Sequence, residues 1–178
     1  MIKKQSIPAT ETNFNFPWGI AIFGYLMSFG LIFTFFGAYF WDDWYTSYTL
    51  DNAGAKVYWD GYGWLPIHAI FQVDILHRNP QLFRAIILLS FFFSGYFLFF
   101  ILKTLRFLSK WQVQAITILF LVMPINSARV AGNLAYTYSI LIFYFAWFLL
   151  VTKRHTITKI IALGLFVLSF STLSLMPF

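Results

Sequence analysis

The sequence predicts an all-α integral membrane protein, and composition, the length of the apolar segments and the placement of charges all indicate this class. Of the 178 residues, 60% are hydrophobic, 23% are aromatic and 10% are charged. Soluble domains carry about 25% charged residues, well above this share. The excess of Phe, Tyr and Trp is typical of chains whose rings line bilayer interfaces and pack between helices.

Five apolar segments follow one another, and we expect each to form a transmembrane helix. A segment inside a bilayer must satisfy its own backbone hydrogen bonds, so helices are the expected form. The first segment, of 25 residues, is long enough to cross with some tilt. The third is short. The predicted segments are residues 17–41, about 82–102, about 111–125, about 134–151 and about 157–178.

The basic residues orient these segments. We expect residues 1–16 to form a cytoplasmic tail, followed by a membrane domain over residues 17–178. With a cytoplasmic N-terminus, eight Lys and Arg residues lie inside and four lie outside, as the positive-inside rule requires. The predicted location is a bacterial cytoplasmic (inner) membrane. The inside set is Lys3, Lys4, Lys103, Arg106, Lys110, Lys153, Arg154 and Lys159, and the outside set is Lys56, Arg78, Arg84 and Arg129.

Several classes of function are excluded by composition. The net charge is +6, but the basic residues flank apolar segments and leave no stripe for a phosphate backbone, so we expect no nucleic-acid partner. The chain has no cysteine, which excludes disulfides, thiolate metal sites and a cysteine nucleophile.

The predicted first outer loop, residues 42–81, contains turn residues and then a short amphipathic pattern. In "IHAIFQVDILHR", Ile67, Ile70 and Ile75 recur at helical spacing, while His68 and Asp74 project elsewhere. This pattern predicts a helix that lies in the membrane interface, ended by the Asn79-Pro80 pair.

Two adjacent acids, Asp42 and Asp43, follow the first apolar segment within "GAYFWDDWYTSY". A carboxylate at the mouth of a membrane cavity can act as a general base or hold a divalent cation such as Mg²⁺ or Mn²⁺. Alternatively, both acids only mark the interface and solvate the end of the helix.

A second polar interval, "MPINSARVAGNLAYTYS", interrupts the apolar sequence near the same predicted face. Non-helical backbone at membrane depth is tolerated only against protein or a water-filled cavity. Arg129 is therefore a candidate for binding phosphate through its planar guanidinium. The alternative is a plain turn between the third and fourth helices. We also count Asn126, Asp60 and His68 as candidate substrate-binding residues, although a polar position on an interfacial helix explains His68 as well.

The order of these features resembles the N-terminal part of the polytopic GT-C fold glycosyltransferases, in particular the protein O-mannosyltransferase and lipid-sugar arabinosyltransferase groups. The resemblance is carried by "FWDDW", "DGYGWLP", the interfacial helix, the second apolar segment with its basic turn, and "LFLVMPINSARVAGNLAYTYSILIFYFAWFLL". It covers about residues 17–178.

The resemblance implies an enzyme that takes a sugar from a polyprenyl-phosphate donor and transfers it at the outer face of the membrane. The acceptor is a hydroxyl of a glycan, lipid or protein. Asp42 or Asp43 would be the catalytic base. We favour Asp43, which lies farther from the apolar segment. Because members of the family usually have seven or more membrane helices, we expect this chain to be the N-terminal portion of a longer protein.

Three alternatives stay open at this point. A polysaccharide polymerase or ligase would use Arg or His in long later loops. A transporter or flippase of lipid-linked glycans would place ionisable groups in the middle of helices, and the first, second and fifth predicted helices show none there. A non-catalytic membrane subunit or remnant needs no site at all.

Overall fold

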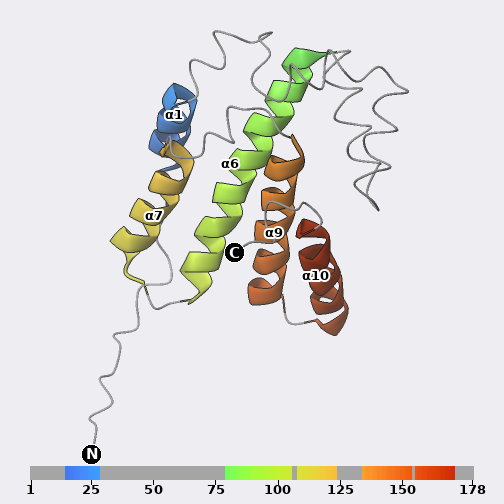
Figure 1. Ribbon diagram of the computed structural model, residues 1–178. Coiled ribbons are helices and arrows are strands. Elements are labelled where there is room, and N and C mark those ends of the chain that lie inside the picture. The colour runs from blue at the N-terminus through green and yellow to red at the C-terminus, as the bar shows by residue number, and fades with distance from the viewer. Residues whose placement is uncertain (1–14, 29–78, 106–107, 124–133, 154, 171–178) are drawn as a thin grey trace, which may run out of the picture.

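The computed structural model describes residues 15–28, 79–105, 108–123, 134–153 and 155–170, which form five α-helices and no strand. The all-α prediction is confirmed for this part of the chain, and each helix falls on one of the predicted apolar segments. Residues 29–41, the interfacial helix and residues 171–178 lie outside the described residues. The helices are α1 (Trp18–Ser28), α6 (Pro80–Leu105), α7 (Lys110–Val122), α9 (Leu134–Thr152) and α10 (Thr156–Ser169) (Figure 1).

Local capping residues fix where two helices begin. The backbone N–H of Leu82 donates to Asn79 Oδ1 at 2.9 Å, and Pro80 occupies the first helical position of α6. The sequence predicts the Asn79-Pro80 pair as the end of the preceding helix; the structure uses it to begin α6. Ser109 and Gln112 form a reciprocal capping box at the start of α7.

Helix α6 lies between the other helices, and the directions of the other helices are described relative to it. It packs against α7 and α9, while α10 packs on α9 and α1 packs on α7 (Figure 1). Ring pairs Phe97–Phe145, 5.1 Å apart, and Phe100–Phe148, 6.0 Å apart, show that α6 and α9 run parallel. Helices α1, α7 and α10 run in the opposite direction (Figure 1).

The contacts of α1 confirm its direction. Phe16, just before α1, has its ring 4.7 Å from that of Phe99, whereas the Tyr25 hydroxyl donates to the Leu88 carbonyl at 2.6 Å. Increasing residue number along α1 therefore corresponds to decreasing number along α6.

These directions give the bundle two distinct ends. At one end, α6 is followed by α7 and α9 is followed by α10 after short connections. We call it the lysine end, because Lys103, Lys110, Lys153 and Lys159 lie there. At the other end, α1 and α7 finish and α6 and α9 begin (Figure 1). The intervals of residues 29–78 and 124–133 are therefore both attached at this second end. We call it the long-loop end.

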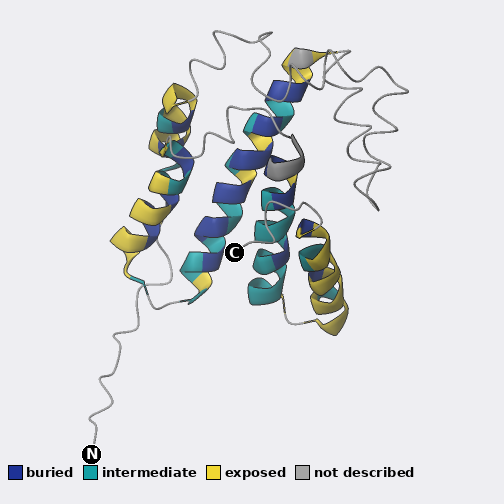
Figure 2. Ribbon diagram, viewed as in Figure 1, coloured by how far each residue is buried: buried dark blue, intermediate teal, exposed yellow. Residues whose placement is uncertain are grey.

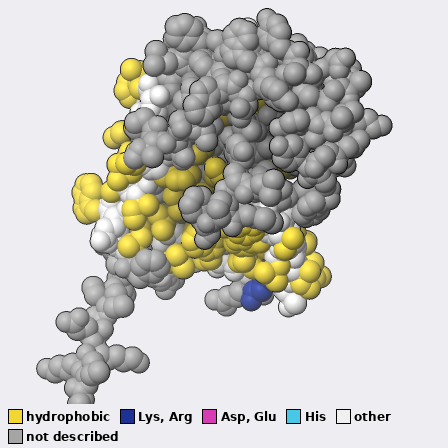
Figure 3. All heavy atoms as spheres, in the orientation of Figure 1, with side chains coloured by type: hydrophobic (Ala, Val, Ile, Leu, Met, Phe, Trp, Pro, Cys, Tyr) yellow, Lys and Arg dark blue, Asp and Glu magenta, His cyan; other side chains and the backbone are white. Residues whose placement is uncertain are grey.

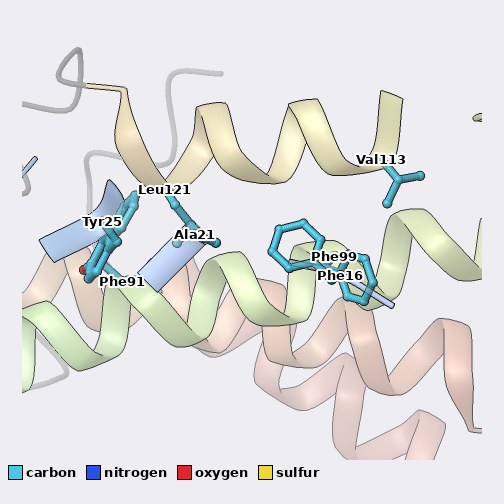
Figure 4. Packing of buried hydrophobic residues seen from close by; sticks show 7 residues of the cluster. All are labelled: Phe16, Ala21, Tyr25, Phe91, Phe99, Val113 and Leu121. Atoms are coloured by element: carbon cyan, nitrogen blue, oxygen red, sulfur yellow. The ribbon is translucent and has the colours of Figure 1, made fainter. Parts of the chain in front are cut away.

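The buried core joins α1, α6 and α7. Rings and aliphatic side chains from the three helices interdigitate over their facing sides (Figure 4). The dispersion contacts between such closely packed side chains are individually small and collectively large. The central cluster is Phe16, Ala21, Tyr25, Phe91, Phe99, Val113 and Leu121.

The outward sides of the flanking helices are apolar too. Figure 2 shows exposed residues along α1, α7 and α10, while α6 and α9 are mostly buried or partly buried. Large hydrophobic residues make up much of this exposed surface, including Phe23 (67% exposed) on α1 and Trp111 (77% exposed) on α7. Figure 3 shows hydrophobic side chains over most of the coloured surface on the face in view.

Among the described residues, one helical stretch is both long and apolar enough to cross a membrane: Gln81–Leu105 of α6, which contains an 18-residue window with a mean hydropathy of 2.4. The stretches Trp18–Ser28, Lys110–Val122, Thr137–Thr152 and Thr156–Ser169 are apolar but shorter. A single long apolar helix also fits the core of a soluble protein, so five membrane crossings stay a prediction.

The close approach of α6 and α7 at Gly95 gives a test of the packing. A Cβ at Gly95 would meet Leu121 Cδ2 and lie 2.8 Å from its Cγ, and Leu121 is fully buried. We expect Gly95→Ala to lower the free energy of unfolding by about 1–3 kcal/mol because α7 must move away. Unfolding in mixed detergent micelles, followed by circular dichroism, measures this change.

Gly164→Ala in α10 is the matched control, since nothing lies within 4 Å of an added Cβ there. It should keep the stability or raise it by up to about 1 kcal/mol through better helix propensity. The double variant Gly95→Ala, Leu121→Ala should lose less than the sum of its single variants. Equal effects of the two glycine substitutions would contradict this packing.

Candidate functional site

The residues predicted to carry the chemistry lie outside the described residues. They occur in the two long intervals, residues 29–78 and 124–133, and their roles stay predictions. The structure does define where these intervals are attached, because the helices that precede and follow each of them end or begin at the long-loop end. The predicted site residues are Asp42, Asp43, Asp60, His68, Asn126 and Arg129.

Arg84 is a buried charged residue at the same end. It is the fifth residue of α6 and is 3% exposed. Its guanidinium carbon lies 5.5 Å from the centroid of the Phe83 ring, and Phe83 is itself fully buried. At a rise of about 1.5 Å per residue, Arg84 lies about 6 Å along the axis from the start of a helix about 39 Å long.

The sequence analysis missed this residue as a site candidate. The count of charges places Arg84 on the outer side of the membrane, and the structure places it in the second turn of α6, near the long-loop end. The signal was present in the run "LFRAIILL", where one arginine interrupts an apolar segment. An arginine within such a segment is a functional candidate by default.

A buried guanidinium constrains what surrounds it. Arginine side chains carry a positive charge in proteins, and burying a charge is costly unless an anion compensates it. The described ranges of the chain contain no Asp or Glu, and all acids of the sequence occur within its first 74 residues. A carboxylate that meets Arg84 must therefore come from those residues or from another molecule. Its planar donors also match a phosphate bidentately.

Several hydroxyl groups of the described helices donate to the backbone of their own helix. Ser94 Oγ donates to the Ser90 carbonyl at 2.8 Å, and Thr117 Oγ1 donates to the Val113 carbonyl at 2.8 Å. The hydroxyls of Thr104 and Thr152 bond in the same way to the carbonyl four residues earlier. This pattern leaves these groups satisfied without water and makes them poor candidates for nucleophiles.

No metal centre is found within the described residues, since no group of three His, Cys, Asp or Glu side chains comes together there. His155, the one described residue of these types, lies at the lysine end. The divalent cation suggested for Asp42 and Asp43 falls on residues outside the described part and stays a prediction.

Comparison of the chain with protein-family models, with curated proteins and with solved structures found no match. The resemblance to GT-C glycosyltransferases therefore stays a prediction from the sequence.

The burial of Arg84 can be tested by chemical modification. Phenylglyoxal modifies accessible arginines, and we expect Arg84 in the folded chain to react at least tenfold more slowly than in the chain unfolded by detergent and urea. Peptide mass spectrometry measures the modified fraction at this residue over time. Equal rates in the folded and unfolded chains would contradict the buried position.

Proposed function

We propose that this chain is the N-terminal helical module of a membrane glycosyltransferase. It would transfer a sugar from a polyprenyl-phosphate donor to an acceptor hydroxyl at the outer face of the membrane. One observation carries the proposal beyond the sequence resemblance: both intervals that hold the predicted site residues attach at the long-loop end, where the cationic Arg84 is buried.

The exposed apolar surface supports membrane embedding. Within the apolar stretch of α6, 44% of the residues are buried, less than expected for the central helix of a soluble core. The outward sides of α1, α7 and α10 expose large hydrophobic residues, an arrangement that water disfavours and lipid accepts (Figure 2). The side-chain hydroxyls that bond to their own helices are compatible with a site without water.

The alternating helix directions support the proposed topology. With α1 leading from the lysine end to the long-loop end, the next four described helices alternate in direction (Figure 1). The described lysines outside the helix interiors lie at the lysine end, which would face the cytoplasm under the positive-inside rule. The long-loop end would then face outward.

The depth of Arg84 suits a lipid-linked phosphate. A polyprenyl donor is too apolar to leave the bilayer, so its phosphate is met near the headgroup level. Arg84 lies within about the first 6 Å of α6, which is a suitable depth if the long-loop end reaches the outer interface. We assign Arg84 and Arg129 to the donor phosphate, and Asn126, Asp60 and His68 to other substrate contacts.

Asp42 or Asp43 would act as the general base. The acceptor hydroxyl gives its proton to the carboxylate, and its oxygen forms a bond to the anomeric carbon of the sugar. The bond between that carbon and the phosphate oxygen breaks, and the lipid phosphate leaves with both electrons of the bond. Cationic groups near the phosphate stabilise the charge on the leaving group. A divalent cation is optional in this scheme.

Substitution of the acids tests this role. The assay uses membranes from cells that express the whole open reading frame containing this chain. We expect Asp43→Asn to reduce sugar transfer by roughly 100-fold or more. Asp42→Asn should show whether the neighbouring acid shares the role. The measurement is release of polyprenyl phosphate from a panel of polyprenyl-phosphate sugars, followed by mass spectrometry.

Asp51→Asn is the matched control, because it removes another acid from the same predicted loop without touching a proposed site. It should keep transfer within about twofold while inserting to the same level. If the wild type transfers sugar and all three variants keep its rate, the carboxylate base is wrong. If the wild type transfers none of the sugars, a non-catalytic membrane subunit becomes the better account.

A further inference from the structure

The lysine end gathers positive charge from four helices. Lys103 lies in the last turn of α6, Lys110 begins α7, Lys153 follows α9 directly, and Lys159 is the fourth residue of α10. The Phe100–Phe148 ring contact of 6.0 Å holds the final turns of α6 and α9 side by side, so these positions share one end of the bundle. In Figure 3, Lys or Arg atoms lie at the lower edge of the face in view, beside hydrophobic side chains.

The local sequence keeps this end strongly cationic. Residues 103–110 and 153–159 contain six Lys and Arg residues and no acid. The only acid of the predicted cytoplasmic side is Glu11, so a pairing with any one of these residues would still leave five positive charges. Lys153 and Lys159 are exposed. Helices α7 and α10 begin at this end while α6 and α9 finish there, so the helix dipoles largely cancel and the positive charge comes from the side chains.

Exposed apolar side chains border the lysines. Trp111, which follows Lys110, is 77% exposed, and Leu163, one helical turn beyond Lys159, is 57% exposed. A free phosphate ion gains no binding energy from contact with apolar side chains. A phospholipid does gain from such contact, because its anionic headgroup meets the cationic surface while its acyl chain meets the adjacent apolar surface.

We propose that the lysine end binds anionic phospholipid headgroups of the phosphatidylglycerol class in the leaflet that faces the N-terminal tail. Lys153 and Lys159 are the residues that we expect to contribute most, because both are exposed and Lys159 stands on the apolar face of α10. The inference rests on the membrane embedding proposed above but not on the transferase chemistry. Basic residues near an anionic membrane surface are attracted by its negative potential.

Lipid retention tests the proposal. The full chain is reconstituted into nanodiscs of phosphatidylcholine with phosphatidylglycerol as a minor component and then extracted mildly. Mass spectrometry of the lipids that stay bound gives the ratio of the two lipids. For the wild type we expect this ratio to exceed the bulk ratio several-fold. Lys153→Gln with Lys159→Gln should bring the ratio close to the bulk value at low salt, because each lysine contributes to the attraction.

Two matched variants separate charge from folding. Lys153→Arg with Lys159→Arg keeps the charge and should keep the enrichment. Lys56→Gln with Arg78→Gln removes two charges from the predicted opposite side and should also keep it. Millimolar inorganic phosphate should not displace the bound lipid, whereas high salt should weaken its retention.

The outcomes distinguish this inference from the proposed function. Unchanged enrichment in Lys153→Gln with Lys159→Gln, or no enrichment in an inserted wild-type chain, overturns the lipid site alone. Displacement by inorganic phosphate also overturns it, because the site would then be one for soluble anions. A chain that fails to insert into nanodiscs and stays soluble overturns the membrane embedding, and the lipid site with it.

Discussion

The close contact between α6 and α7 at Gly95 is the constraint on which the arrangement of the bundle depends. Because Gly95 has no side chain, the buried Leu121 can approach the α6 backbone, and the rings of Phe91 and Phe120 stack 4.9 Å apart beside it. Helix α1 then rests on the surface that α6 and α7 form together. The opposite side of α6 is left for α9, which in turn carries α10.

This arrangement divides the polar groups between two ends. The short connections bring the lysines of the described helices to one end. The two long intervals, which contain the predicted site residues, are attached at the other end, where Arg84 is buried. The helical middle contains hydroxyls bonded to their own backbone and a large number of aromatic rings. A middle of this kind suits lipid, while its two ends suit different polar surroundings. The proposed function and the proposed lipid site use one end each.

The sequence predicts the helical elements well, because the length of each apolar run and the basic residues beside it indicate where a helix lies and ends. Residues 82–102 and 134–151 come within a few residues of α6 and α9. The sequence does not predict that Asn79 and Pro80 start α6, since the same pair also fits the end of a preceding helix. It places Arg84 within the second apolar segment but does not identify it as a site residue. Burial of Arg84 depends on packing between helices, which local patterns do not contain. The candidate site beyond Arg84 lies outside the described residues.

The most direct test of the account is to determine which side of the membrane each end faces. Because the chain contains no cysteine, a single introduced cysteine is the only thiol that can be labelled. Single variants Gln81→Cys and His155→Cys place one thiol at an exposed position of each end. An impermeant maleimide added to intact spheroplasts should label the thiol at residue 81 and should reach residue 155 only after the membrane is disrupted. Equal labelling of both positions in intact spheroplasts, or labelling of neither until disruption, would contradict a bundle that crosses the membrane in this orientation.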